Sequence, residues 1–251
     1  MVRIIHCICG ERLEGANDRA LFEAFRAHIQ SAHPDFPVTD QDIRRTFDEW
    51  VGSERWDGER REVTGPIEVR PLGPNTLDDF LTYFDRRAFM DNPFWFGCYC
   101  LESHGIDPDL QTAAENRDSK IGFIRDGSAR GFLAYVDGEP VGWCNAGSRS
   151  VLPGVLQKFL AGTEHDPAER IGAIACFNVS APYRGSGVAR ALLDAACEGL
   201  RAQGFPAVEA YPRKGELSEA RSYRGPLEMY ERAGFERHSE TEYYLVMRKR
   251  L

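Results

Sequence analysis

The order of strand and helix patterns over residues 65–251 predicts an α/β fold, preceded by a smaller, mainly helical module over residues 1–64. Three observations carry this prediction. Two strand patterns in RGFLAYVDGEPVGWCNA meet at Asp137-Gly138, a dipeptide typical of β-hairpins. The apolar run IGAIACFNVS passes through a glycine-containing turn into a segment whose apolar residues recur at helical spacing. Further strand and helix patterns alternate from there to the end of the chain.

The first 64 residues contain two predicted helices. Leu21, Phe22, Phe25 and Ile29 fall near one face of a helix in GANDRALFEAFRAHIQSAH. A second helix follows in TDQDIRRTFDEWV, where Thr39 is placed to cap its N-terminus. The polar, glycine-containing stretch GSERWDGERREVTGP then predicts a linker, and we place the domain boundary at residue 64.

The second domain begins with a strand pattern, IEVRPL, and a helix pattern, NTLDDFLTYFDRRAF, before the aromatic loop NPFWFGCYC. The hairpin and a buried strand over residues 171–179 follow. After the glycine-containing turn and its helix, AVEAYP predicts another strand. PLEMYERAGF predicts a short helix with a proline near its start, and EYYLVMRK predicts the closing strand.

Composition and charge restrict the functions open to the chain. Its 251 residues carry a formal charge of -8, and they contain no block of lysine or arginine that would grip nucleic-acid phosphates. No apolar stretch approaches the roughly 20 residues that cross a bilayer, and the opening MVRIIHCICG is too short and too polar for a signal peptide. We therefore expect a cytoplasmic protein without nucleic-acid or membrane partners. Seven unevenly spread cysteines then indicate reduced thiols or metal ligands, not disulfides.

The turn RGSGVA, residues 184–189, lies between the buried strand and the following helix. The first N–H groups of a helix have no partner within the helix, and they favour an anion. Gly185 and Gly187 allow positive φ and a close approach of the backbone to a ligand. Neither the G-x-G-x-x-G pattern of dinucleotide-binding folds nor the G-K-S/T of a P-loop is present. The turn therefore predicts a phosphate site of another kind.

The same turn resembles the R/Q-x-x-G-x-G/A pyrophosphate loop of the GNAT N-acetyltransferase superfamily, with Arg184, Gly187 and Ala189 in the three marked positions. The segment MYERAGF resembles the L/M-Y-x-x-x-G-F segment that closes the domain in this family. The resemblance covers about residues 66 to 250 and implies a GNAT fold, with a central mixed, mostly antiparallel sheet flanked by helices. It also implies acetyl-CoA, or another acyl-CoA, as the donor.

In this family the strand before the loop splays from its neighbour, and the pantetheine arm of the donor bonds to main-chain groups in the gap. The side chains at the splay are equally suited to a core, and Arg184 is equally suited to a solvent-exposed position. The resemblance assigns donor binding to Phe177, Asn178, Val179, Arg184, Gly185, Ser186, Gly187, Val188 and Ala189.

Acyl transfer from a thioester to an amine needs a neutral amine and a proton for the leaving thiolate. Tyr230 in LEMYERAGF matches the tyrosine that many family members use as the acid, and a packing role is its alternative. Glu209, in the middle of a predicted strand, is the candidate base, with an ordered water as the alternative. A covalent route through Cys144 or Cys176 would need an activating partner, which the sequence does not identify.

The stretch DNPFWFGCYCLESHG resembles a loop near the acceptor side in a bacterial subset of the superfamily. Its aromatic side chains and the following hairpin predict the walls of an acceptor pocket, with ordinary core packing as the alternative. Cys98, Cys100 and Cys144 suggest no metal site, because no fourth ligand accompanies them. The candidate acceptor residues are Trp95, Phe96, Tyr99, Trp143 and Asn145, with Arg149 beside them.

The N-terminal module contains a candidate metal site. Cys7 and Cys9 stand near a glycine turn, and His28 and His33 stand at the end of the first helix. Two thiolates and two imidazoles are ligands of tetrahedral structural zinc, so we predict a Cys2His2-type module that resembles small bacterial Cys/His domains. Buried free cysteines with surface histidines are the alternative, and His6 is a substitute ligand. The acidic setting argues against a DNA-reading finger, so we expect the module to dock on the second domain, to cap the acceptor cleft or to bind another protein.

The sequence thus predicts an acetyl-CoA-dependent N-acetyltransferase in which the primary amine of a small molecule attacks directly within a ternary complex. Two alternatives stay open: a protein or peptide N-acetyltransferase, and a CoA-binding interaction protein without catalysis. An open acceptor groove would favour a protein acceptor, whereas a closed aromatic pocket would favour a small molecule. Dimers are common in the superfamily, which allows a homodimer here.

Overall fold

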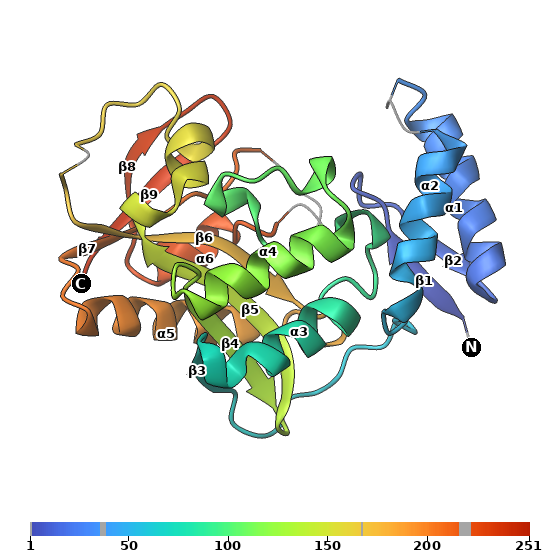
Figure 1. The fold of residues 1–251 in the computed structure, drawn as a ribbon, viewed down its shortest axis with the longest axis horizontal. Coiled ribbons are helices and arrows are strands. Elements are labelled where there is room, and N and C mark those ends of the chain that lie inside the picture. The colour runs from blue at the N-terminus through green and yellow to red at the C-terminus, as the bar shows by residue number, and fades with distance from the viewer. Residues whose placement is uncertain (1, 36–38, 167, 216–221) are drawn as a thin grey trace.

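A seven-stranded sheet forms the centre of the larger domain in the computed structural model, which describes residues 2–35, 39–166, 168–215 and 222–251 (Figure 1). In order across the sheet, the strands are β3 (Glu68–Pro71), β4 (Gly131–Val136), β5 (Glu139–Ser148), β6 (Ile171–Val179), β7 (Ala207–Ala210), β9 (Leu245–Arg250) and β8 (Glu236–Glu240). Among these described strands, β6 and β7 form the one parallel pair. The prediction of a mixed, mostly antiparallel sheet is confirmed.

The hairpin between β4 and β5 turns at the predicted dipeptide. The register pairs Val136 with Glu139, so Asp137 and Gly138 alone form the connection. Both have positive φ, 52° and 80°, which glycine adopts freely and aspartate tolerates better than most residues. The local sequence therefore determines where this hairpin turns.

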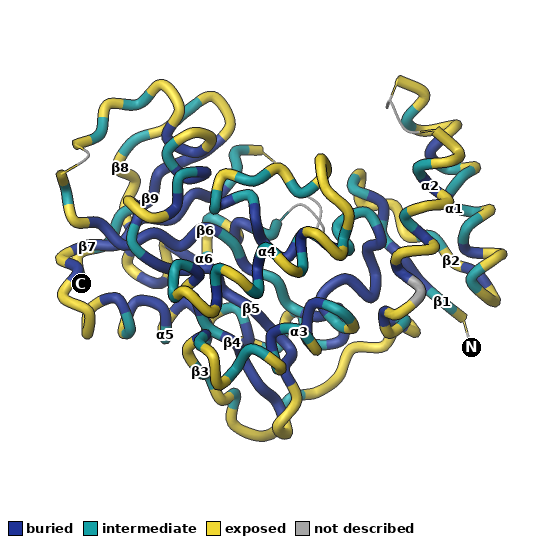
Figure 2. Tube along the Cα trace, viewed as in Figure 1, coloured by how far each residue is buried: buried dark blue, intermediate teal, exposed yellow. Residues whose placement is uncertain are grey.

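Side chains of β4 and β5 alternate between two helical layers, and the strands themselves are almost entirely buried (Figure 2). Ala134 and Val136 contribute to the core beneath α5, whereas Leu133 and Tyr135 contribute to the core beneath α3 and α4. A Cβ at Gly142 would lie 2.7 Å from a methyl carbon of α5, so glycine allows that helix to approach the sheet closely. The helices are α3 (Leu77–Arg86), α4 (Ala113–Arg125), α5 (Val188–Ala202) and α6 (Leu227–Arg232).

The sequence patterns do not predict α4, because its buried face carries polar Asn116 and Lys120 beside Ile124. They also do not predict the short helical turns in the connections. Among the described residues, no helix is both long and apolar enough to cross a membrane. The short turns are η1 (Trp50–Gly52), η2 (Pro74–Thr76), η3 (Pro93–Trp95), η4 (Glu102–His104), η5 (Pro108–Leu110), η6 (Arg149–Val151), η8 (Ala181–Tyr183) and the π-helix η7 (Val155–Phe159).

The N-terminal module packs two helices, α1 (Asp18–Ala32) and α2 (Asp40–Glu49), against a two-stranded antiparallel sheet of β1 (Arg3–His6) and β2 (Arg12–Gly15). The two strands are shorter than a sequence pattern can identify. Thr39 caps α2 as predicted: its hydroxyl accepts from the N–H of Asp42, whose carboxylate accepts from the N–H of Thr39. The core of the module contains Ile5, Cys7, Leu21, Phe25, Ile29, Ile43, Phe47 and Trp50.

The predicted linker is bound to both parts of the chain. The N–H of Ile4 donates to the carbonyl of Trp56 at 3.2 Å, which adds the linker to the module. The N–H of Arg61 donates to the carbonyl of Pro182 at 2.7 Å, just before the glycine-containing turn. Ile4, Trp56, Met90 and Ala181 form one small buried cluster. The module therefore packs on the larger domain instead of being joined to it by a free tether.

Candidate active site

An open cleft of about 1440 Å³ lies where β6 ends and the N-terminal module meets the larger domain. Its wall includes residues 176–179 of β6, residues 92–98 of the aromatic loop, residues 222–226, Arg184 and Ala189. Side chains of α2 border it as well, namely Asp42, Arg45, Thr46 and Glu49. The cleft therefore brings together the predicted donor strand, part of the predicted acceptor loop and the module.

The glycine-containing turn has the conformation that its sequence predicts. Gly185 and Gly187 have φ of 81° and 91°, and α5 begins at the next residue, Val188. A Cβ at Gly185 would meet no atom within 4 Å, so the space in front of the turn is open. The hydroxyl of Ser186 donates to the carbonyl of Tyr183 at 2.6 Å, which orders the turn. Its main-chain N–H groups and the N-terminus of α5 thus have the geometry of an anion site.

The strands β6 and β7 diverge as a donor-binding gap requires. They pair from Ile171 with Ala207 to Ile174 with Ala210, after which β7 ends and β6 continues to Val179. Phe177, Asn178 and Val179 all border the cleft.

The chain itself occupies part of this gap. The N–H of Phe177 donates to the carbonyl of Tyr223 at 2.6 Å, and the guanidinium of Arg224 donates to the carbonyl of Ala175. The carbonyl of Val179 accepts from Nε of Arg184 at 3.0 Å. Main-chain groups along this edge of β6 therefore already have protein partners.

Arg184, the charged residue of the turn, is held by a buried carboxylate. Asp91 is 1% exposed and accepts from Nη2 of Arg184 at 2.8 Å and from Nδ1 of His6 at 3.2 Å. Burial alone would raise the pKa of Asp91, but Arg184 and His6 outweigh it and lower the pKa below its ordinary value. The guanidinium therefore anchors the turn to the module through Asp91, and its charge is already paired.

Tyr230 is buried behind the cleft wall. Its hydroxyl donates to the carbonyl of Arg224 at 2.6 Å, and burial raises the pKa of the phenol well above its ordinary value. A Cβ at Gly225 would lie 2.7 Å from this hydroxyl oxygen, and Gly225 itself borders the cleft. Tyr230 itself is fully buried and is separated from the cleft by the main chain around Gly225.

Glu209 does not face the cleft, and the structure corrects the expectation that it is the base. Its carboxylate is 1% exposed and accepts from Arg149 at 3.2 Å, from Arg248 at 2.6 Å and from the hydroxyl of Tyr211 at 2.9 Å. Two guanidinium groups occupy the oxygens that would have to accept a proton from the amine. Glu209 and Arg149, which the sequence placed near the acceptor, are parts of a structural ion network.

The predicted acceptor residues divide into two groups. Trp95 and Phe96 border the cleft, and Trp95 packs edge-on against Tyr223 with ring centroids 5.0 Å apart. Tyr99 instead donates its hydroxyl to Asp85 at 2.6 Å beneath the surface. Trp143 and Asn145 are fully buried in β5 and do not border the cleft. The alternation of a strand allows either face, so the sequence could not distinguish these two outcomes.

Trp143 and Asn145 belong to a buried polar cluster that the sequence analysis did not identify. Nδ2 of Asn145 donates to Sγ of Cys100 at 3.3 Å and to the hydroxyl of Ser103 at 2.6 Å. The fully buried ammonium of Lys120 lies 3.2 Å from Nε2 of His104. Because α4 has no clear amphipathic pattern, the sequence gives no signal for Lys120.

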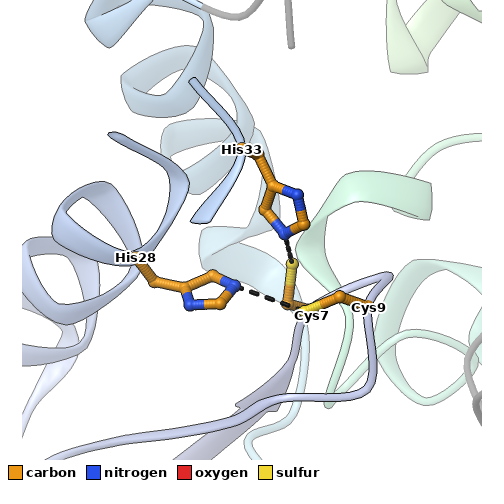
Figure 3. Close-up of side chains that lie close together, drawn as sticks. All are labelled: Cys7, Cys9, His28 and His33. Atoms are coloured by element: carbon orange, nitrogen blue, oxygen red, sulfur yellow. Dashed lines mark hydrogen bonds between the residues drawn. The ribbon is translucent and has the colours of Figure 1, made fainter. Parts of the chain in front are cut away.

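The four predicted zinc ligands converge between the β1–β2 turn and the end of α1 (Figure 3). Cys7 Sγ lies 3.4 Å from His33 Nε2, and Cys9 Sγ lies 3.4 Å from His28 Nε2. All four ligand atoms lie within 4.8 Å of one another. The edge between sulfur and nitrogen in a tetrahedral zinc site is about 3.5 Å, from ordinary bond lengths. The arrangement of the four residues therefore fits a zinc ion.

Comparison with known proteins identifies one family. The sequence profile of the acetyltransferase (GNAT) family matches residues 92–235, more than half of the chain. No curated protein matches the chain. Among solved structures, an N-acetyltransferase from Staphylococcus aureus Mu50 is 16% identical, with a TM-score of 0.45 over 74% of this chain and 99% of that chain. The GNAT domain of S. lividans PAT is 16% identical, with a TM-score of 0.47 over 74% and 92%. The PaiA N-acetyltransferase from Thermoplasma acidophilum, solved with coenzyme A, is 12% identical, with a TM-score of 0.44 over 74% and 100%.

Substitution of Asp91 by asparagine tests the anchor of the turn. It leaves the guanidinium of Arg184, whose side chain is 20% exposed, without its charge partner. We expect the free energy of unfolding at pH 7 to fall by about 2 kcal/mol, less than the roughly 3–5 kcal/mol found when one partner of a fully buried pair is removed. Denaturant titration measures this loss. The matched control is Asp194→Asn, because Asp194 forms an exposed pair with Arg190 that contributes at most about 0.5 kcal/mol.

The effect of Asp91 depends on pH with a defined sign. Its pKa is lowered in the folded state, so its carboxylate stabilises the fold fully above the unfolded pKa of about 3.9. This contribution is lost as the pH falls through the folded-state pKa. The difference in stability between wild type and Asp91→Asn therefore shrinks below about pH 4. A difference that grows on acidification would contradict the assignment.

Proposed function

Because the chain belongs to the GNAT acetyltransferase family, we propose that it transfers the acetyl group of acetyl-CoA to the primary amine of a small molecule. One observation carries the donor half of this proposal. The glycine-containing turn that opens α5, with φ of 81° and 91°, adjoins the cleft at the point where β6 leaves β7. The turn provides N–H groups for a pyrophosphate, and β6 beyond its pairing with β7 would provide main-chain groups for a pantetheine arm once the arm displaces the contact between Phe177 and Tyr223.

The residues of the turn have two roles: some would contact the donor, and Arg184 holds the turn in place. The N–H groups of residues 185–189 and the positive end of α5 attract the pyrophosphate. Arg184 keeps the turn in place through Asp91, so we assign it an anchoring role alongside whatever charge it presents to the donor. We assign the pantetheine arm to the edge formed by Phe177, Asn178 and Val179, which would direct the thioester toward Cys176.

Tyr230 is the proposed acid for the departing CoA thiolate. Burial keeps its phenol protonated at neutral pH, and Gly225 leaves its hydroxyl close to the cleft. With Glu209 enclosed by arginines, direct attack by an amine in a ternary complex depends on an ordered water to accept the amine proton. The overall reaction is the same whichever group accepts that proton.

Two features of the cleft support a small, positively charged amine as the acceptor. Side chains of α2 border the cleft, so the module narrows the space that an acceptor enters. Carboxylates border the cleft alongside the cations of Arg45, Lys158 and Arg213, and they would attract a protonated amine. These carboxylates belong to Asp42, Glu49, Asp107, Asp109 and Glu115. A protein or peptide acceptor, and a CoA-binding protein without catalysis, are the alternatives that the experiments below separate.

We also propose that the module binds one structural zinc ion through Cys7, Cys9, His28 and His33. The supporting observation is the convergence of four suitable ligand atoms from the β1–β2 turn and the end of α1. Burial raises the pKa of Cys7 to about 11, so a bound cation would be needed to hold this thiolate at neutral pH. Four protein ligands leave no open position, so the ion would stabilise the module and take no part in acyl transfer.

Titration of acetyl-CoA into the purified protein, followed by calorimetry, tests the donor site. We expect wild type to bind with a Kd of about micromolar magnitude, and Gly187→Asp to bind at least about tenfold more weakly, a change of about 1.4 kcal/mol. The introduced carboxylate repels the pyrophosphate, and φ of 91° strains any side chain at this position. The matched control is Gly162→Asp, because Gly162 has φ of 77° on an exposed turn with nothing within 4 Å.

The titration, followed by two acceptor screens, separates the three proposed functions. Equal binding by wild type and Gly187→Asp would refute the donor site. If the donor binds, a screen of small amines and of peptides identifies the acceptor class by formation of the acetylated product. Donor binding without any product in both screens would favour the non-catalytic alternative.

Metal analysis tests the zinc proposal. We expect about one zinc ion per chain in wild type and little in Cys9→Ala, because three ligands bind zinc more weakly than four. Cys197→Ala is the matched control, since it removes another cysteine that lies in α5 within the larger domain. A wild-type protein that is metal-free and fully folded would end the proposal.

A further inference from the structure

A buried ammonium lies behind the cleft without a carboxylate partner among the described residues. Lys120 is fully buried, and its ammonium contacts the faces of Phe80 and Trp143 at 5.7 and 5.6 Å from the ring centroids. Its nearest polar neighbour is Nε2 of His104 at 3.2 Å. Burial and Lys120 lower the pKa of His104 to about 3, so this imidazole is neutral at pH 7. Burial lowers the pKa of Lys120, whereas negative charge on Cys100, Cys98 or Cys176 raises it, so the ammonium is stabilised when a neighbouring thiol is ionised.

Three thiols surround this ammonium, and one of them is prepared to be the anion. The hydrogen bond from the Cys176 thiol, followed by the charge of Lys120, lowers the pKa of Cys100 to about 6 despite its burial. Nδ2 of Asn145 donates to the same sulfur at 3.3 Å, which also favours the thiolate. Burial instead raises the pKa of Cys98 to about 12.

Cys100 borders the cleft at the place where the donor is proposed to end. Cys100 is 6% exposed and borders the cleft together with Cys176 and Phe177 of β6. The backbone presents it in an unusual conformation, because Tyr99 and Cys100 have φ of 41° and 56° although neither is glycine. Strain of this kind persists only where the surroundings impose it, and it concentrates at functional sites.

We propose that Cys100 is a nucleophile that takes the acetyl group from acetyl-CoA and passes it to the amine, with Lys120 as the positioning residue that balances the thiolate charge. This inference rests on the proposed function and replaces direct attack with two successive transfers. It also accounts for a cluster of cysteine, lysine and asparagine that direct attack does not use.

Each transfer exchanges one thioester or amide bond for another. In the first, the Cys100 thiolate attacks the acetyl carbonyl, the bond between the acetyl carbon and the CoA sulfur breaks, and CoA leaves as a thiolate that receives a proton from Tyr230 or water. In the second, the amine attacks the acetyl-cysteine, an amide forms, and Cys100 departs as a thiolate beside Lys120. The amine gives up one proton to solvent. The sum is acetyl-CoA plus amine giving amide plus CoA.

The alternative is a structural role, in which the lysine and the thiolate only satisfy each other inside the fold. The two roles differ in one observable, because only a covalent intermediate allows acetyl groups to move between CoA molecules when no amine is present. Direct attack in a ternary complex gives no such exchange. The test therefore needs no knowledge of the acceptor.

The experiment incubates the protein with acetyl-CoA and isotopically labelled CoA, and follows the appearance of labelled acetyl-CoA by mass spectrometry. We expect exchange in wild type and a loss of about 100-fold or more in Cys100→Ala. Cys197→Ser is the matched control, because it removes a thiol of α5 that does not border the cleft, and we expect it to retain exchange. Cys100→Ser repeats the test with a smaller change in shape. Calorimetry with acetyl-CoA confirms that each variant keeps the donor site.

Lys120→Met tests the positioning role by a readout that packing alone would not move. We expect its alkylation of Cys100 by iodoacetamide at neutral pH, and its exchange rate, to fall about tenfold while acetyl-CoA affinity is retained.

The outcomes distinguish a failure of the covalent route from a failure of the proposed function. Absence of exchange in a wild type that binds acetyl-CoA overturns the covalent route and leaves the proposed function intact, and so does exchange that survives in Cys100→Ala. A wild type that fails to bind acetyl-CoA overturns the proposed function and this inference together.

Discussion

The buried carboxylate of Asp91 is the contact on which the arrangement of the cleft depends. It joins His6 at the end of β1 with Arg184 at the start of the glycine-containing turn, two residues that are far apart in the sequence. An anion at 1% exposure is stable only while its cationic partners stay in place. Because moving Arg184 away would leave the buried carboxylate without its cationic partner, the pair fixes the position of the turn that opens α5 relative to the module.

Contacts from the linker reinforce the same region. The guanidinium of Arg60 donates to the carbonyl of Ala181 at 2.6 Å, and the N–H of Arg61 donates to the carbonyl of Pro182 at 2.7 Å. These carbonyls belong to η8, which connects β6 to the turn. The residue after His6 is the zinc ligand candidate Cys7, so the proposed metal site and the proposed pyrophosphate site are attached to the two sides of one ion pair. The module is thus a structural part of the cleft.

Local signals explain which features the sequence could predict. The Asp137-Gly138 hairpin and the turn at Gly185 and Gly187 depend on backbone conformations that few residues adopt, so composition reveals them. The Cys/His spacing is likewise informative, because two cysteines and two histidines are typical ligands of structural zinc. The environment of Glu209 depends on partners from other elements, and strand alternation allows either face, whereas the environment of Tyr99 in its loop depends on Asp85 of α3. Lys120 was missed because its helix shows no clear amphipathic pattern, so nothing in the sequence marks this polar residue as fully buried.

Two buried ionisable groups, Glu209 and Lys120, differ in their partners, and this difference separates a structural role from a catalytic one. Glu209 is surrounded by two guanidinium groups and a hydroxyl, all of which donate hydrogen bonds to its carboxylate, so its role is architectural. Lys120 is surrounded by a neutral imidazole, aromatic faces and thiols; burial lowers its pKa, and a neighbouring thiol that loses its proton raises it. A thiolate that balances a buried charge is also a nucleophile when it borders a cleft, as Cys100 does. A carboxylate beside Lys120 would form a second structural ion network. The thiol of Cys100 is instead a candidate for catalysis, because it can lose its proton and attack a carbonyl carbon.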